Sequence, residues 1–319
     1  MRLFRNFLLR CWMEKVNILI AKNSGFCFGV RRAIDIALGV SKKSGSVYTI
    51  GPIIHNPQVV EELENKGVKV IRKLSDIKTG SIIIRAHGVP KNIFDEAKAK
   101  GIKVLDATCP FVTRSKNYAE KLAREGYKIV IIGNPNHPEI KYIFSYLPKN
   151  TVILKTNKDI KKLKFFPKIG IITQTTQSPE NFKKIAAGLL GYSNEFKIFN
   201  TICPDAINRQ KEAMKMAKKC DVVVVIGGKN SANTKRLAAI SKKIRKKTYH
   251  IETSQDLKNE WLKDVKCVGI VAGASTPDWI IKEAVEIIKG IKPCVIIARS
   301  EMKTSFHFTR LLDNKKDRQ

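Results

Sequence analysis

The chain has 319 residues, enough to bury a substantial core and ordinarily to form two or three domains. Its apolar fraction of 43% is that of a soluble globular protein, and its longest apolar runs, such as 222–226, are far too short to span a bilayer. The formal charge of +32 indicates an anionic partner, either nucleic acid or a phosphorylated substrate. We nevertheless assign most of this charge to lysine-rich solvated helix faces, because no basic stretch is interleaved with stacking aromatic residues.

Seven cysteines are dispersed along the chain, and no secretory signal with a cleavage site precedes them. This pattern predicts a reducing, cytoplasmic environment, where cysteines serve as metal ligands, nucleophiles or small core residues. Residues 1–12 are basic and apolar without a cleavage signature, and we interpret Met13, just before the first expected strand, as the translational start.

Three times along the chain, a β-like apolar run leads to a cysteine and then to an amphipathic helical stretch. These cysteines are Cys27, Cys109 and Cys203, and the helical stretches after them span 30–38, 111–124 and 206–217. In each copy, a second β-like run ends in a glycine 24 residues after the cysteine, at Gly51, Gly133 and Gly227. Three matching spacings indicate an internal repeat, since glycine after a single strand is routine in any β/α protein.

In each copy a third strand ends in a small polar loop with a proline, at 86–90, 174–179 and 272–277. Alternating strands and helices predict mainly parallel sheets with crossover helices, so we expect an α/β fold. We expect three pseudo-threefold-related β/α domains at 17–100, 101–194 and 195–290, with an N-terminal extension at 1–16 and a C-terminal tail at 291–319. Since ligands bind beyond the carboxyl ends of parallel strands, the loops of all three domains would meet at one centre.

Cysteines at helix N-termini are chemically unusual, because the helix dipole and free amides are expected to lower the thiol pKa and favour the metal-binding thiolate. Three thiolates from three domains suit an iron–sulfur cluster, which normally takes four ligands, so that one iron could bind substrate. Zinc and unrelated core cysteines are the alternatives, but zinc sites usually draw on a Cys-x-x-Cys pair, which the sequence lacks. Cys220 and Cys267 lie within or beside apolar runs and are interpreted as core residues.

Several polar side chains lie in the loops after the strands, although a lone histidine in such a loop is often only a turn residue. They are His55, His87, His137, Thr175, Ser231, Asn233 and Ser275. Imidazoles, hydroxyls, an amide and helix N-termini together predict a cradle for phosphate oxygens. Glu139 is the lone acid in these loops, and a neighbouring anion would raise its pKa and suit it to donate a proton; its alternative role is a helix cap.

Taken together, these motifs resemble the 4-hydroxy-3-methylbut-2-enyl diphosphate reductase family, which completes the methylerythritol phosphate route to isoprenoids. The resemblance covers roughly residues 15–289 in order. It is carried by Gly25-Phe26-Cys27, Ile54-His55-Asn56, Ala86-His87-Gly88-Val89, Asp106-Ala107-Thr108-Cys109-Pro110, His137-Pro138-Glu139, Thr173-Gln174-Thr175-Thr176, Lys229-Asn230-Ser231 and Ala272-Gly273-Ala274-Ser275. It implies reductive dehydroxylation of the allylic diphosphate to isopentenyl and dimethylallyl diphosphate.

The resemblance implies one [4Fe–4S] cluster per chain between the three domains, held by Cys27, Cys109 and Cys203, with the substrate's 4-hydroxyl oxygen on its unique iron. It implies that Glu139 donates protons and that the other polar side chains surround the substrate, mainly its diphosphate: His55, His87, His137, Thr175, Ser231, Asn233 and Ser275. Ferredoxin or flavodoxin would supply electrons, in keeping with a sequence that has neither Gly-x-Gly-x-x-Gly nor a P-loop. We expect no nucleic-acid or membrane partner, and a monomer or homodimer.

One departure from the family pattern concerns the phosphate cradle. The family commonly has Ser-Ser-Asn where this chain has Ser231-Ala232-Asn233, so we expect weaker substrate affinity rather than loss of activity. Two other functions stay open: a three-cysteine cluster enzyme resembling quinolinate synthase that acts on a dicarboxylate, and an iron–sulfur protein that binds nucleic acid. The cradle favours a diphosphate over a dicarboxylate, and steep salt dependence would identify nucleic-acid binding.

Overall fold

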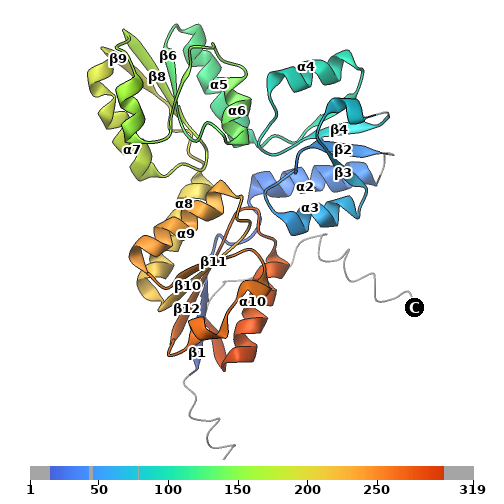
Figure 1. Cartoon of the computed structure of the whole chain (residues 1–319), viewed down its shortest axis with the longest axis vertical. Coiled ribbons are helices and arrows are strands. Elements are labelled where there is room, and N and C mark those ends of the chain that lie inside the picture. The colour runs from blue at the N-terminus through green and yellow to red at the C-terminus, as the bar shows by residue number, and fades with distance from the viewer. Residues whose placement is uncertain (1–14, 43–45, 78, 298–319) are drawn as a thin grey trace, which may run out of the picture.

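Three separate β-sheets form three lobes around a common centre (Figure 1). The computed structural model describes residues 15–42, 46–77 and 79–297, so the proposed start at Met13 lies outside the described residues. All strand pairs within the three sheets are parallel, which confirms the predicted α/β fold. Among the described residues, none of the helices has the length and apolar character that a bilayer span requires.

The first lobe is built on a four-stranded sheet with the order β3-β2-β4-β5. Its elements are α2 (Phe28–Ser41), β2 (Val47–Ile50), α3 (Pro57–Glu64), β3 (Val68–Ile71), the short 3-10 helix η1 (Leu74–Asp76), β4 (Ser81–Ile84), α4 (Lys91–Ala99) and β5 (Lys103–Asp106). Strand β4 is buried along its whole length because helices cover both faces of the sheet. Ile83 packs with α2 and α3, whereas Ile82 packs with Ala97 of α4.

The second lobe repeats this plan with the strand order β7-β6-β8-β9. Its elements are α5 (Pro110–Arg124), β6 (Lys128–Ile132), α6 (Pro138–Phe144), β7 (Val152–Leu154), η2 (Asn157–Lys162), β8 (Lys168–Thr173), α7 (Pro179–Gly188), η3 (Leu190–Tyr192) and β9 (Glu195–Ile198). Alternate residues of β6 face opposite ways: Ile129 and Ile131 pack with α5 and α6, and Val130 and Ile132 pack with α7. Two-sided burial explains why these strands read as continuous apolar runs.

The third lobe holds a five-stranded sheet with the order β11-β10-β12-β1-β13. Its elements are β1 (Val16–Ile20), α8 (Pro204–Lys219), β10 (Val222–Ile226), α9 (Ala232–Ile244), β11 (Thr248–Ile251), η4 (Ser254–Asp256), η5 (Asn259–Leu262), β12 (Cys267–Ala272), α10 (Asp278–Ile291) and β13 (Cys294–Ile297). On one face the sheet packs on α10, and on the other it packs on α8 and α9. All three lobes therefore share one layered architecture.

The strands that make up each sheet differ from those expected for domains that begin at residues 17, 101 and 195. Each strand that leads to a cysteine pairs with the sheet of the preceding repeat: β5 with β4, β9 with β8, and β1 with β12. Because parallel neighbours need a crossover connection, α4 and α7 carry the chain to β5 and β9 within one lobe. The chain then enters the next lobe at the cysteine, and β1 closes the ring by joining the third lobe.

The expected tail at 291–319 also differs from the structure at its beginning. Strand β13 lies at the edge of the third sheet, paired in parallel with β1. Its four residues form too short an apolar run to show a periodicity in the sequence. Residues 298–319 lie outside the described residues.

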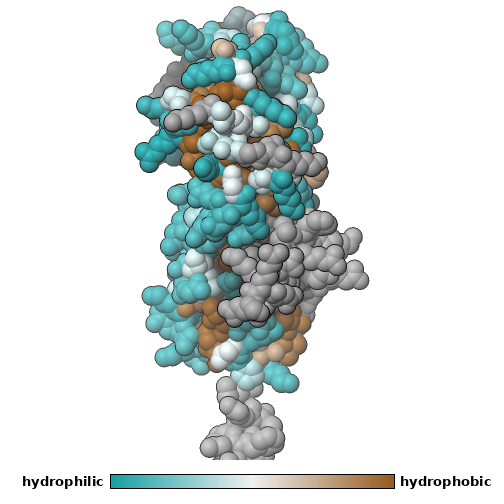
Figure 2. Space-filling model, turned by 90° about the vertical axis from the view of Figure 1, so that its right-hand side faces the viewer, coloured by the Kyte–Doolittle hydropathy of each residue, from teal (hydrophilic) through white to brown (hydrophobic). Residues whose placement is uncertain are grey.

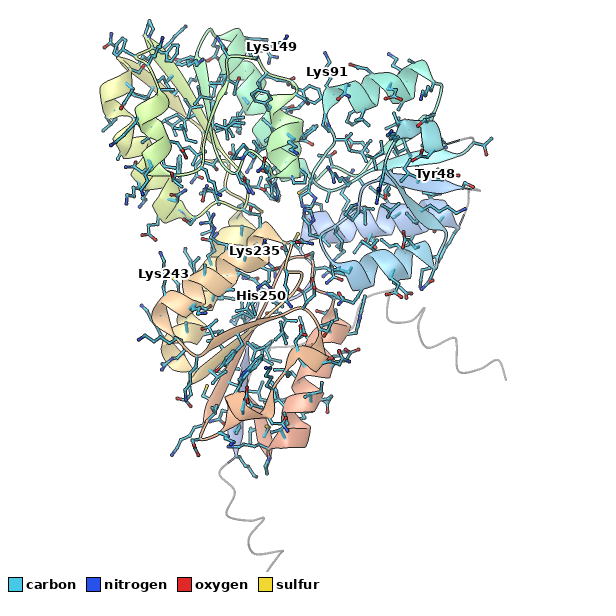
Figure 3. The ribbon with its side chains drawn as sticks, in the orientation of Figure 1. Tyr48, Lys91, Lys149, Lys235, Lys243 and His250 are labelled. Atoms are coloured by element: carbon cyan, nitrogen blue, oxygen red, sulfur yellow. The ribbon has the colours of Figure 1, made fainter. Side chains whose placement is uncertain are left out.

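Hydrophilic residues are spread over the surface, and lysines are found on each of the three lobes (Figure 2, Figure 3). On the face shown in Figure 2, hydrophilic residues extend over the length of the molecule between smaller apolar patches. Lys91, Lys149, Lys235 and Lys243 are found on all three lobes in Figure 3. Lys91, Lys235 and Lys243 lie on helices α4 and α9, in keeping with the assignment of most of the +32 charge to solvated helix faces.

Candidate functional site

Each of the three repeat cysteines is the N-cap residue of a helix that enters the next lobe. Their backbone N–H groups donate equivalent hydrogen bonds to the loops after the third strands: Cys27 to Ala274 O at 3.1 Å, Cys109 to Ala86 O at 2.9 Å, and Cys203 to Thr175 O at 2.9 Å. Each loop belongs to the preceding repeat, so the same bond joins neighbouring lobes three times. The three thiols are thereby fixed around one centre.

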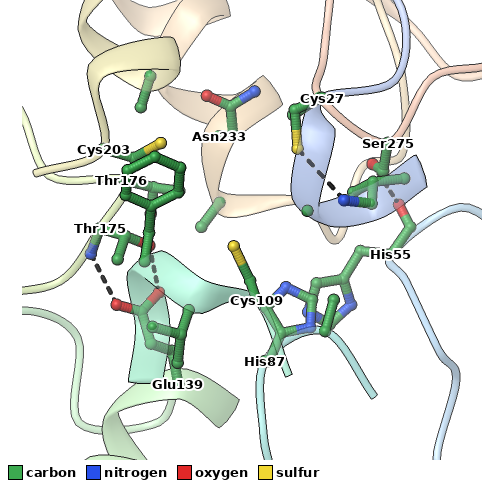
Figure 4. Close-up of a pocket in the computed structure, with 18 of the residues that line it drawn as sticks. Cys27, His55, His87, Cys109, Glu139, Thr175, Thr176, Cys203, Asn233 and Ser275 are labelled. Carbon is green, nitrogen blue, oxygen red and sulfur yellow. Dashed lines mark hydrogen bonds between the residues drawn. The ribbon is translucent and has the colours of Figure 1, made fainter. Parts of the chain in front are cut away.

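All eleven residues selected from the sequence line one pocket between the lobes, and Figure 4 labels all of them except His137 and Ser231. They are Cys27, His55, His87, Cys109, His137, Glu139, Thr175, Cys203, Ser231, Asn233 and Ser275. Cys220 and Cys267 do not line it; Cys220 is buried in the third lobe and Cys267 is half-buried. The repeat pattern therefore separates pocket cysteines from the others in the described part of the chain.

Several further lining residues were missed in the sequence. They follow the cysteines by two or three positions: Gly29, Val30, Phe111, Val112, Asp205 and Ala206. The identical offset in each repeat was a usable signal. At Gly29 the approach is so close that an added Cβ would lie 2.5 Å from the Cys109 sulfur, so only glycine fits there. The first turns of three helices therefore form one wall of the pocket.

Burial, rather than the helix N-termini, dominates the acidity of the three thiols. Desolvation raises the pKa of Cys27 and Cys203, and raises that of Cys109 to about 11, although backbone N–H groups act in the opposite direction. The lowered pKa expected from the sequence is therefore wrong for the protein without a bound cation. A bound metal group would reverse this balance, because a coordinating thiol is deprotonated outright.

The spacing of the sulfurs distinguishes between possible metals. Among the described His, Cys, Asp and Glu residues, only His55, His87 and His137 bring three possible ligand atoms within 4.8 Å of one another. The three cysteine sulfurs do not form such a group. Thiolates on one tetrahedral zinc, each about 2.3 Å from the metal, would have sulfurs only about 4 Å apart. The three sulfurs therefore do not form a group as close as one zinc ion requires, which favours a larger polynuclear group.

Three histidines form a second wall of the pocket. Their ring centroids are 4.5 Å apart for His55–His87, 5.5 Å for His87–His137 and 6.1 Å for His55–His137. Burial lowers the pKa of all three, to about 4 for His137, and the charge of Arg85 acts in the same direction. The imidazoles are therefore neutral at pH 7, and each presents a donor or acceptor without carrying charge.

Buried side-chain atoms without a hydrogen-bond partner face this pocket. They include Nε2 of His55, Nδ1 of His87 and Nδ2 of Asn233. Figure 4 shows these three side chains around the same space as the cysteines. Because buried polar atoms are nearly always paired in folded proteins, this set indicates a polar ligand that completes their hydrogen bonds.

Glu139 is almost fully buried, with 1% of its surface exposed. The Thr175 backbone N–H donates to Oε1 at 2.7 Å, and the Thr175 hydroxyl donates to Oε2 at 2.6 Å (Figure 4). Burial raises the Glu139 pKa to about 7, because desolvation outweighs these two bonds. The carboxyl group can therefore hold and release a proton near neutral pH. The alternative role of Glu139 as the cap of α6 is filled by His137, whose Nδ1 accepts the Glu139 N–H at 3.2 Å.

Two serines complete the pocket from the third lobe. Ser231 caps α9 by accepting the Thr234 N–H at 3.3 Å, which leaves its hydroxyl hydrogen free to reach a ligand. Ser275 donates to the backbone oxygen of His55 at 3.2 Å and so joins the third lobe to the histidine loop. Ala232 lies between Ser231 and Asn233 in the pocket wall and contributes only its methyl group and backbone.

Three parallel sheets around a pocket of thiols, imidazoles and one buried carboxyl group define a three-lobed α/β protein with a candidate metal centre. The model of a family described as LytB protein matches residues 18–289, which is most of the chain. The chain therefore belongs to the LytB family.

Named relatives support this membership over nearly their whole length. The chain is 46% identical over 272 residues to the 4-hydroxy-3-methylbut-2-enyl diphosphate reductase of Syntrophotalea carbinolica, covering 85% of this chain and 98% of that protein. It is 45% identical over 276 residues to the reductase of the same name from Geotalea daltonii, covering 86% and 98%.

Solved structures of this enzyme are also similar to the chain. One of (E)-4-hydroxy-3-methyl-but-2-enyl diphosphate reductase, titled the terminal enzyme of the non-mevalonate pathway, shares 45% identity and a TM-score of 0.66, covering 86% of this chain and 99% of the other. The structure of the Plasmodium falciparum reductase shares 29% identity and a TM-score of 0.82, covering 95% and 99%.

Proposed function

We propose that this protein is a 4-hydroxy-3-methylbut-2-enyl diphosphate reductase. It converts the allylic alcohol, two electrons and two protons into water and a mixture of isopentenyl and dimethylallyl diphosphate. The observation that carries this proposal is the convergence of three thiols, three neutral imidazoles and a proton-holding carboxyl group in one pocket. Membership of the LytB family argues against the dicarboxylate enzyme considered from the sequence.

The thiols of Cys27, Cys109 and Cys203 fit a [4Fe–4S] cluster. They do not form a group of described residues whose ligand atoms all lie within 4.8 Å of one another, and they come from three lobes that enclose a common centre. When bound, such a cluster would relay the electrons of an external donor one at a time, and three cysteines leave one of its four irons without a protein ligand. Burial makes the free thiolates unfavourable. A bound metal group, which stabilises its thiolate ligands, is therefore favoured at this site.

The remaining side chains bind and orient the diphosphate. The unpaired nitrogens of His55, His87 and Asn233 supply or accept hydrogen bonds, and Ser231 adds a hydroxyl. Arg85 supplies positive charge behind the histidines, since its charge lowers the pKa of all three. A neutral-to-positive cradle of this kind suits an anion with several acceptor oxygens.

Glu139 supplies the proton that makes hydroxide a better leaving group. As the carbon–oxygen bond breaks, this proton joins the departing hydroxyl and water is formed. The allyl fragment has then gained two electrons, and a second proton adds to it at one of two carbons. Addition at one end gives isopentenyl diphosphate, and addition at the other gives dimethylallyl diphosphate. Thr175 orients Glu139 with both of its donors, so its role is positioning rather than the substrate contact expected from the sequence.

The electrons come from a separate protein, because the sequence has no nucleotide-binding fingerprint with which to hold a nicotinamide or flavin. Ferredoxin or flavodoxin are suitable donors: both are acidic, and this chain carries a charge of +32.

An anaerobic turnover assay tests the proposed function. Protein reconstituted with iron and sulfide is mixed with the allylic diphosphate and reduced methyl viologen, and products are separated by chromatography. We expect two viologen radicals to be oxidised for each molecule of isopentenyl or dimethylallyl diphosphate formed. Protein that carries its cluster but leaves the diphosphate unchanged would contradict the proposal.

Replacing Thr175 tests its positioning role. Thr175→Val removes one donor to the Glu139 carboxylate and keeps the backbone N–H, so the Glu139 pKa should rise further above its ordinary value. We expect the alkaline limb of the kcat–pH profile to move to higher pH. Thr175→Ser keeps the hydroxyl and is the matched control, with an unshifted limb. Equal profiles for both variants would show that the hydroxyl does not act through Glu139.

Ala232 offers a test of the phosphate cradle. Ala232→Ser restores the family's hydroxyl in the pocket wall and should lower KM, since a hydrogen bond to a charged group contributes about 1.5–3 kcal/mol at most. Steady-state kinetics with the diphosphate measure the effect. An unchanged KM would mean that the backbone or water already satisfies that phosphate oxygen.

A further inference from the structure

The residues that directly follow the three repeat cysteines form an exposed apolar surface. Phe28, Pro110 and Pro204 occupy equivalent positions at the start of α2, α5 and α8, and all three are exposed. Phe28 is 63% exposed although it is a large aromatic residue. Because the cysteines that these three residues follow line one pocket, the repeat places the three apolar groups around the same centre, and exposed apolar groups gathered in this way are typical of a protein interaction site.

Two arginines flank these apolar groups, and we call the five residues Phe28, Arg32, Pro110, Arg114 and Pro204 the cysteine face. Arg32 joins α2 to the loop before Cys109, with bonds of 3.1 Å to Thr108 O and 3.3 Å to Asp106 O. Arg114 is exposed, and its guanidinium carbon lies 5.0 Å from the centroid of the Phe111 ring, which lines the pocket.

Two carboxylates that are close in the chain to residues of this face, Asp106 and Asp205, each have a hydrogen-bond partner. Asp205 binds Arg209 with contacts of 2.6 and 3.4 Å, and Asp106 accepts the Thr108 N–H at 2.8 Å. The two arginines of the face and the overall charge of +32 oppose the negative charge of these carboxylates. The face is therefore apolar at its centre and positive at its rim, which suits a partner with an acidic rim.

We propose that the cysteine face docks a small acidic electron-transfer protein and is the entrance for electrons. This inference rests on the proposed function and adds the surface through which the donor acts. The three apolar residues of the face each directly follow a pocket cysteine, so a donor seated on it would lie close to the thiols. Electron transfer falls steeply with distance, which favours this surface over any outer helix face. Two docking events, each oxidising one donor by one electron, supply one turnover.

Two electron donors of different size test this inference on the holoenzyme. Reduced ferredoxin must dock, whereas reduced methyl viologen is a small cation that the positive face does not attract. We expect Arg114→Glu to lower ferredoxin-driven kcat/KM by about tenfold at low ionic strength, and to weaken its salt dependence. Phe28→Ser should lower it as well, because its exposed ring contacts the donor. Viologen-driven turnover should not change in either variant.

Lys243→Glu provides the matched charge reversal. Lys243 is exposed near the far end of α9 (Figure 3), away from the cysteines, and should leave both rates unchanged. Equal ferredoxin-driven rates in Arg114→Glu, Phe28→Ser and the unaltered protein would overturn the docking face. A parallel fall with both donors would also overturn it, by showing that these residues support the metal centre. Failure of the proposed function is distinct, because the unaltered protein would then not turn over with viologen.

Discussion

Glu139→Gln is expected to lower kcat by about 10²–10⁴-fold, the usual contribution of a positioned general acid. Glutamine keeps the size of the side chain but cannot release a proton to the departing hydroxyl. Because Glu139 is buried against Thr175 and is not one of the proposed cluster ligands, the variant should keep its visible chromophore and its affinity for the diphosphate. Stopped-flow turnover, the visible spectrum and calorimetric binding on one preparation measure all three.

Stability against pH gives an independent measure of the same carboxyl group. Burial raises the folded-state pKa of Glu139 to about 7, above its ordinary value of 4.5, so folding favours its protonated form. The stability that it contributes is complete below pH 4.5 and is lost as the pH rises to about 7. Between pH 5 and 8, Tm should therefore fall further for the unaltered protein than for Glu139→Gln. A variant with normal kcat and a lower Tm would instead assign Glu139 a structural role.

Replacing any one of Cys27, Cys109 or Cys203 with serine should abolish the brown chromophore and turnover. Each thiol comes from a different lobe, so no neighbouring cysteine in the pocket can substitute for the one that is lost. Iron and sulfide content, visible absorption and viologen-driven turnover measure the loss.

Cys220→Ser and Cys267→Ser are the controls for this series. Burial and a hydrogen bond to Cys267 raise the pKa of Cys220, and neither residue lines the pocket. Both variants should keep the chromophore, with at most a modest loss of stability from the buried hydroxyl of Cys220→Ser. Loss of the chromophore in these variants, with retention in the repeat-cysteine variants, would overturn the ligand assignment.

The repeat in the sequence was sufficient to predict which loops meet, because the ends of parallel strands must lie at one edge of a sheet. Cysteines at matching positions and glycines 24 residues later identified the three copies. The α/β class followed from alternating strands and helices, and all eleven selected side chains line one pocket. Their individual roles in binding and catalysis are proposals that the variants above address.

Strand pairing could not be predicted in the same way. Strand β1 precedes Cys27, yet its neighbours β12 and β13 lie near the other end of the described chain. No local pattern states which sheet a buried strand joins, since an apolar run suits any of them. Placing β1, β5 and β9 with the following unit was therefore an error of connectivity rather than of secondary structure.

Side-chain contacts and burial were also beyond the sequence pattern. Both donors of Thr175 face Glu139, a pairing between the segments that follow the adjacent strands β6 and β8 of the second lobe. Burial between the lobes raises the pKa of the repeat thiols, which the helix N-termini alone would lower. Local geometry was predictable, but the degree of desolvation was a property of the assembled lobes.

Mössbauer spectroscopy of protein reconstituted with iron-57 tests the central claim most directly. If three thiols hold a [4Fe–4S] cluster beside the diphosphate cradle, one iron of four has no cysteine ligand and differs from the rest. We expect the signal of that one iron to change when the allylic diphosphate is added, and the other three to stay as they were. Iron bound only as isolated ions, or four equivalent irons that do not respond to the diphosphate, would contradict the account.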